Sequence, residues 1–348
     1  MSDRSTSLVA VTLLAALVAA CGGGDGGSPS PAPAPAPAPA PVPTPAPAPV
    51  PAPPSVVNAN LLPQVIDPAV TTALETHVAI NPSPDVAAKN RLFVFLPGTG
   101  AHPASYQKIL VSGAARGLHT LGLNYPNPVE VGVLCAGTAP SEACFWNVRR
   151  EILTGADLTT KVSIAPPDAI VTRVAEALAY LQANFPDQGW GQYLQGDGSV
   201  DWRKVTVGGH SQGGGHAGVM AKLYAMHGAC YFDSPADWDL VPGQPAGWEA
   251  YPNVTPAASQ FGFSNTLDTL VPWVQLQPIW QSMGLAAFGA PMSVDGAAAP
   301  YGGSHMLTTT TSAAGSTGLH SLTVADLVTP MAGGQPLFDA VWNQACFQ

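Results

Sequence analysis

From residue 76 onward, short apolar runs alternate with segments of helical periodicity. We expect strands at 76–80, 92–96, 119–124, 205–207, 229–232, 260–263 and 291–294, because each run is short and bounded by polar or turn-forming residues. Helices are expected at 103–116, 167–185, 217–226 and 337–345. The second has Ile170, Val174, Leu178 and Leu181 at helical spacing after a proline pair. This alternation predicts an α/β fold with a mainly parallel central sheet and helices on both faces.

Two stretches interrupt the alternation and are expected to be long loop insertions. They cover residues 125–166 and 233–256, and the second contains Trp238, Trp248 and Tyr251. Loops of this length in a compact domain are usually functional or disordered. The aromatic side chains are equally compatible with lining an apolar cleft and with covering the core.

The N-terminal segment is typical of an export signal. Residues 8–20 form an apolar stretch that is too short for a permanent membrane span and ends in Val18-Ala19-Ala20-Cys21. Small residues followed by cysteine resemble a bacterial lipobox. That resemblance implies a signal peptide over residues 1–20, cleavage before Cys21 and lipidation of its thiol; ordinary signal cleavage beside an incidental cysteine is the alternative.

The next segment, residues 21–55, is expected to be a linker. Three glycines open it, and proline then alternates with alanine, valine or threonine as far as Pro54. Such a sequence cannot build a core and favours extended polyproline II. The globular domain is therefore expected to cover residues 56–348, a length that suits one large α/β domain.

Charge and cysteine content narrow the class of protein. Charged residues are only 10% of the chain and the net charge is −10, with no basic cluster, so nucleic-acid binding is not expected. Four cysteines follow Cys21, and an even number in an exported protein suggests disulfides. Cys135 and Cys144 flank a short loop and are favoured as one bridge, which leaves Cys230 and Cys346 as the other. No spacing of metal ligands indicates a metal site.

The most informative motif is Gly209-His210-Ser211-Gln212-Gly213. It lies between the apolar run 205–207 and a helical segment, the context of the Gly-x-Ser-x-Gly turn that exposes a serine hydroxyl above a sheet. Glycines on either side allow the strand and the helix to approach closely. Ser211 is therefore the predicted nucleophile. A purely structural glycine-rich turn is the alternative.

A serine nucleophile needs a general base that is oriented by a carboxylate. In the chain order of this fold, the acid follows the nucleophile and the histidine follows the acid. Asp268 comes after the apolar run 260–263 and is the favoured acid, with Asp233 and Asp237 in reserve. Only His305 and His320 follow Asp268. His305 is slightly favoured as the base because it closely follows the strand expected to be last, and His320 remains open.

An oxyanion hole requires two backbone N–H donors. Gln212, the residue after the nucleophile, should supply one of them. The turn after an early strand should supply the other, and Leu96-Pro97-Gly98-Thr99-Gly100 fits this position, so Thr99 and Gly100 are the candidates.

In these motifs the chain resembles the α/β-hydrolases, close to secreted bacterial serine esterases, lipases and polyester depolymerases. The resemblance implies hydrolysis of small or polymeric carboxylic esters through an acyl-enzyme, without a cofactor. It also fits an extracytoplasmic protein held at a bacterial membrane, with the outer membrane favoured, by a lipid on Cys21. An amidase, peptidase or acyltransferase with the same triad, or a surface lipoprotein that only binds, remains open.

Overall fold

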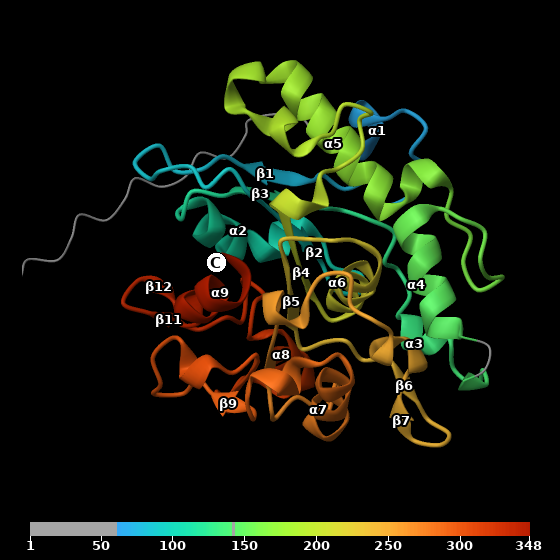
Figure 1. Cartoon of the computed structure of the whole chain (residues 1–348), viewed down its shortest axis with the longest axis vertical. Helices are drawn as coiled ribbons and strands as arrows, with labels where there is room; N and C mark the ends of the chain where they lie inside the picture. The colour runs from blue at the N-terminus through green and yellow to red at the C-terminus, as the bar shows by residue number, and fades with distance from the viewer. Residues whose placement is uncertain (1–60, 141–142) are drawn as a thin grey trace, which may run out of the picture. The chain divides into compact units, whose positions relative to one another are not determined.

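The computed structural model describes residues 61–140 and 143–348. The expected signal peptide, the lipidation of Cys21 and the whole of the expected linker lie outside these residues. The described part is an α/β fold built on a mainly parallel sheet of eight strands (Figure 1).

The strand order of this sheet is β1-β3-β2-β4-β5-β8-β10-β9, and only β1 is antiparallel to its neighbour. In chain order, the strands are β1 (Val78–Ile80), β2 (Leu92–Leu96), β3 (His119–Gly122), β4 (Val205–His210), β5 (Gly228–Phe232), β8 (Gln260–Asn265), β9 (Met292–Ser293) and β10 (Met306–Thr309). Two small hairpins lie apart from the sheet, β6 (Trp238–Asp239) with β7 (Gln244–Pro245) and β11 (Met331–Ala332) with β12 (Gln335–Pro336).

Helices cover both faces of the sheet. They are α1 (Pro63–Ile66), α2 (Gln107–Ala114), α3 (Val131–Leu134), α4 (Cys144–Thr154), α5 (Ile170–Asn184), α6 (Gln212–Leu223), α7 (Trp273–Ser282), α8 (Gly315–Ser321) and α9 (Asp339–Cys346). Helices α2 and α9 lie on one side of the central strands, and α4, α5 and α6 lie on the other (Figure 1).

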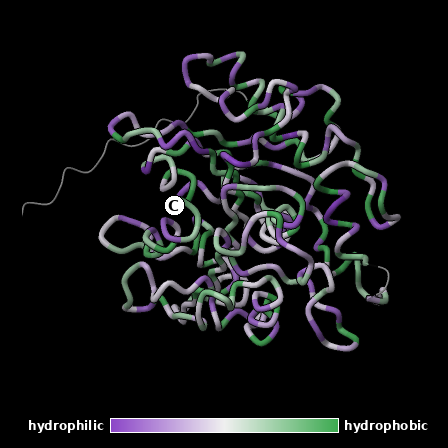
Figure 2. The backbone as a smooth tube through the Cα atoms, in the orientation of Figure 1, coloured by the Kyte–Doolittle hydropathy of each residue, from purple (hydrophilic) through white to green (hydrophobic). Residues whose placement is uncertain are grey.

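Alternate side chains of β2 show how this strand divides the core. Leu92, Val94 and Leu96 pack with α4, α5 and α6, whereas Phe93 and Phe95 pack with α2 and α9. Because successive residues of a strand point to opposite faces, a continuous apolar run is what a strand buried on both faces requires. The hydrophobic stretches run through the middle of the fold (Figure 2).

Three of the differences from the sequence expectation concern the surroundings of the Ser211 motif and of His305. Helices α3 and α4 occupy part of the stretch 125–166, which was expected to be loop. Helix α6 begins at Gln212, directly after Ser211, and not at residue 217. Strand β10 was not predicted, although it is the last strand of the sheet along the chain and follows His305 directly.

Both predicted disulfides are present, Cys135–Cys144 within the insertion and Cys230–Cys346 between β5 and α9. Disulfides of this kind are typical of proteins that fold in an oxidising compartment. Within residues 61–140 and 143–348, every helix is too short or too polar to cross a membrane.

Candidate active site

The sheet has a switch point between β2 and β4. From β2 the chain moves to β3 on one side, and from β4 it moves to β5 on the other. In open α/β sheets, ligands bind outside the carboxyl ends of the strands at such a point. The turn after Leu96 and the turn at Ser211 meet there.

Ser211 occupies the sharp turn between β4 and α6. Its backbone has φ 54° and ψ −119°, a conformation that costs energy for a residue with a side chain. The neighbouring glycines show why the turn needs them. A Cβ on Gly209 would lie 2.3 Å from the Gly213 carbonyl carbon, and one on Gly213 would lie 2.0 Å from Leu96 O. The predicted strand–turn–helix context of the motif is therefore present.

The turn after β2 lies directly against this serine. A Cβ on Gly98 would be 3.3 Å from Ser211 Cβ. The Thr99 hydroxyl donates to Gln212 Oε1 at 2.7 Å. The Gly100 N–H already donates to Asn127 O at 2.9 Å, so Thr99 is the better of the two candidates for an oxyanion donor. Gln212 is the first residue of α6, where a helix leaves its N–H without a partner inside the helix.

Asp268 and His320 form a buried pair. Asp268 follows β8 and His320 lies on α8, and the His320 Nδ1–H donates to Asp268 Oδ2 at 2.6 Å. Burial alone would lower the pKa of the His320 imidazole. The hydrogen bond to Asp268 and the nearby charges of Asp233, Asp268 and Glu130 outweigh burial, so the pKa of His320 is raised above 6.5. The carboxylate also fixes the tautomer, which leaves Nε2 as the nitrogen that can exchange a proton.

A chain of hydrogen bonds connects this pair to the serine turn through His210. The Gly98 N–H donates to the Tyr106 hydroxyl at 3.3 Å, which lies 3.0 Å from His210 Nδ1. The other nitrogen, Nε2, lies 2.9 Å from the backbone oxygen of His320. Because that carbonyl can only accept, Nε2 carries the proton and Nδ1 accepts from Tyr106. Burial and the nearby His320 lower the pKa of His210 to about 3, so it is neutral.

These bonds explain how His320 is held beside the residue that precedes Ser211. The rings of His210 and His320 are 4.7 Å apart between centroids. In the described part of the chain, no hydrogen bond joins Ser211 Oγ to His320 itself. Serine–base hydrogen bonds in ligand-free enzymes are often long and tighten only with substrate bound. Tyr106 was not predicted to belong to the site, because no motif in the sequence includes it.

His305, which the sequence slightly favoured as the base, does not lie at this site. It immediately precedes β10, whose parallel partner is β8, so it lies at the amino end of the strand rather than at the carboxyl end. Its Nδ1–H donates to Gln260 O at 2.9 Å. Its ring is stacked between Phe261 and Phe288, at 3.8 and 4.1 Å between centroids. The structure does not bring His305 to Asp268.

Asp233, one of the two reserve acids, lies beneath the pair and is completely buried. It accepts hydrogen bonds from the Ser264 hydroxyl at 2.8 Å, from the Asn265 N–H at 2.9 Å and from the Thr323 hydroxyl. Burial raises its pKa to about 7. Asp233 therefore ties the end of β8, which leads to Asp268, to the segment that carries His320.

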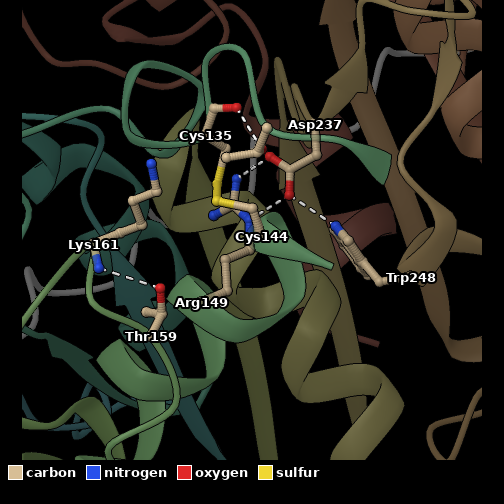
Figure 3. The surroundings of a disulfide bond; sticks show 8 residues. Cys135, Cys144, Arg149, Thr159, Lys161, Asp237 and Trp248 are labelled. Carbon is tan, nitrogen blue, oxygen red and sulfur yellow. Dashed lines mark hydrogen bonds and ion pairs between the residues drawn. A yellow bond between two sulfur atoms is a disulfide. The ribbon is translucent and has the colours of Figure 1, made fainter. Parts of the chain in front are cut away.

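Asp237, the other reserve acid, is used elsewhere. It forms a buried ion pair with Arg149, at 2.6 and 2.5 Å, and accepts from Trp248 Nε1 at 2.8 Å. Arg149 also donates to Gln212 O at 3.0 Å, and it lies on the helix that begins at Cys144 (Figure 3). The bridged insertion therefore supports the first turn of α6. Of the two roles expected for the aromatic residues of the insertion 233–256, Trp248 has the structural one, because its side chain is buried in the core.

Two hollows adjoin the site. A cavity of about 450 Å³ adjoins the oxyanion loop, and its lining includes Gly100, Asn127, Leu134, Ile152 and Gln212. A groove of about 600 Å³ lies between α3 and the β6–β7 hairpin and includes Glu130 and Leu270 in its walls. Both volumes are in the range of small-molecule sites.

No protein-family model and no curated protein matches this sequence. A partly exposed turn serine, a histidine–carboxylate pair and two candidate backbone donors are the kinds of group that acyl transfer requires.

Proposed function

We propose that the protein is a serine hydrolase of the α/β-hydrolase fold that cleaves carboxylic esters. The observation that carries the proposal is the meeting of the strained Ser211 turn with the Asp268–His320 pair at one switch point of the sheet. Three segments far apart in the sequence supply these residues. A turn serving packing alone has no need of a charge-paired histidine beside it.

In the proposed mechanism, Ser211 Oγ attacks the ester carbonyl and His320 Nε2 accepts its proton. Asp268 holds the imidazole and stabilises its charged form, while the Gln212 and Thr99 amides bind the developing oxyanion. His320 then protonates the leaving alcohol. Water, activated by the same histidine, hydrolyses the acyl-enzyme and regenerates Ser211.

We further propose that this reaction takes place outside the cytoplasm, with the protein held at a membrane by lipid on Cys21. The two disulfides support an oxidising compartment. Metabolic labelling with a fatty-acid analogue tests the lipid, since Cys21→Ser should abolish incorporation. Incorporation that persists in this variant would refute lipidation at Cys21.

The test of activity is hydrolysis of p-nitrophenyl esters from C2 to C16 by the wild type and by Ser211→Ala. The exposed Ser199→Ala is the matched control. Short and medium acyl chains should react best, because the cavity beside the oxyanion loop, at about 450 Å³, has the size of a small-molecule site and limits how much of an acyl chain can be buried. We expect Ser211→Ala to lose at least about 10⁴-fold in kcat and Ser199→Ala to match the wild type. Equal inactivity of all three folded proteins would refute ester hydrolysis.

The same machinery serves amide hydrolysis or acyl transfer, and the products separate these reactions. Transfer to an added alcohol or amine that outcompetes hydrolysis would identify an acyltransferase. Faster cleavage of the matched anilide than of the ester would identify an amidase.

A further inference from the structure

The groove between α3 and the β6–β7 hairpin begins beside the proposed acid–base pair. Leu270, in its wall, donates its N–H to Asp268 Oδ1 at 2.8 Å. Glu130, in the opposite wall, lies near enough to His320 for its charge to help raise the pKa of that histidine. In Figure 1, α3 and the hairpin lie next to each other. Hereafter this hollow is called the hairpin groove.

The direction of proton transfer determines which part of an ester this groove can receive. His320 must protonate the oxygen of the leaving alcohol, so the alcohol departs on the histidine side. The carbonyl oxygen points toward the Gln212 and Thr99 amides. The acyl chain leaves the carbonyl carbon in a direction different from that of the alcohol and needs a second space, and we assign to it the cavity that Gly100 and Gln212 line.

We propose that the hairpin groove binds the alcohol portion of the substrate, and that this portion is extended, apolar and without negative charge. This inference rests on the proposed ester hydrolysis and adds the class of leaving group. The charge of the groove and the apolar surface at its outer end both favour such an alcohol.

The charged side chains of the groove are acidic. Glu130 and Asp239 line it, and none of its described lining residues is basic. A carboxylate on the alcohol would meet two like charges. At about 6–8 Å in a solvent-exposed groove, each like charge lowers binding by roughly threefold, or about tenfold for two at low ionic strength.

The outer end of the groove is apolar. Leu240 and Val241 follow β6 and are 75% and 80% exposed, and Leu270 is 54% exposed. Exposed aliphatic side chains grouped on one surface mark binding sites more often than single ones do. The hairpin is fixed at its base, because Asp237 directly precedes β6 and is paired with buried Arg149. The start of the hairpin is therefore held in place against the domain.

The first experiment compares butyrate esters with the same acyl group and different alcohols, hexanol and 6-hydroxyhexanoate. Wild-type kcat/KM should be about tenfold lower for the anionic alcohol. Glu130→Gln with Asp239→Asn should bring the two esters within about twofold of each other. The monohexyl ester of hexanedioate, with its charge on the acyl side, is the substrate control. The ratio of its kcat/KM to the kcat/KM of hexyl butyrate should be the same in the wild type and in this double variant.

The second experiment tests the hairpin with alkyl butyrates from methyl to decyl. The kcat/KM of the wild type should rise with alcohol length, by about twofold for each methylene that is partly buried. Leu240→Asn with Val241→Asn should flatten this rise. Leu327→Asn is the matched control, because Leu327 is 97% exposed and does not line the groove, so the rise should persist.

The outcomes distinguish a failure of the groove assignment from a failure of the proposed ester hydrolysis. Ser211-dependent hydrolysis with equal rates for neutral and anionic alcohols, or with a length dependence that survives the hairpin substitutions, overturns the groove assignment alone. If Glu130→Gln with Asp239→Asn instead changes the relative kcat/KM of the ester that carries its charge on the acyl side, the assignment of the two hollows is reversed. Absence of any Ser211-dependent hydrolysis overturns both proposals.

Discussion

Replacing His305 and replacing His320 should lower the stability of the protein by similar amounts but should change kcat by very different amounts. His305→Gln removes a ring stacked between Phe261 and Phe288. Each aromatic contact is worth about 0.5–1.5 kcal/mol, and glutamine keeps a donor for Gln260 O, so the free energy of unfolding should fall by about 1–3 kcal/mol. His305 touches none of the proposed reacting groups. Its kcat should stay within about twofold of the wild type.

His320→Gln should have a comparable cost in stability and a very different cost in rate. It removes a hydrogen bond to buried Asp268, which is worth about 1.5–3 kcal/mol because the carboxylate is charged. It also removes the only proposed base, and loss of the base of a serine triad lowers kcat by about 10⁴–10⁶-fold.

The assay for this pair is p-nitrophenyl butyrate hydrolysis at a temperature where urea titration shows both variants folded. Because the two variants lose similar stability, a difference in rate cannot come from unfolding. The reasoning is refuted if His305→Gln loses at least as much kcat as His320→Gln.

Two other predictions concern buried charges beneath the site. The folded protein keeps a proton on Asp233 up to about pH 7, whereas the unfolded chain loses it near 3.8, so the contribution of Asp233 to the free energy of unfolding should fall as pH rises between these values. In urea titrations at pH 5 and pH 8, Asp233→Asn should therefore lose less stability than the wild type between the two pH values, and an equal change in both proteins would contradict this. Arg149→Met leaves buried Asp237 without its cation and should cost about 3–5 kcal/mol. Adding Asp237→Asn should recover part of that loss in the same titration, whereas a purely additive loss would argue against the pair.

Contiguous sequence patterns predicted much of the fold and the nucleophile turn. Strands such as β2 are short apolar runs that are buried on both faces, and the glycines around Ser211 reflect contacts within a few residues or with one adjacent strand. The acid was also favoured from local order, and the structure pairs Asp268 with one of the two histidines that the sequence left open.

The choice between those histidines depended on elements whose local signals are weak. Strand β10 reads Met-Leu-Thr-Thr, a run too short to stand out, so His305 was taken to follow the last strand rather than to precede it. Helix α8 contains two glycines and two serines among seven residues, which gives it low helix propensity. Tertiary packing determines both elements. The spacing of Phe145, Val148 and Ile152 was a usable signal for α4.

The most direct test of the central claim is active-site labelling of the folded protein with a fluorophosphonate, followed by peptide mapping. The account predicts one label per chain, located on Ser211, absent in Ser211→Ala and much slower in His320→Gln than in His305→Gln. A folded wild-type protein that takes no label, or takes it on another residue, would contradict the assignment of Ser211 as an activated nucleophile.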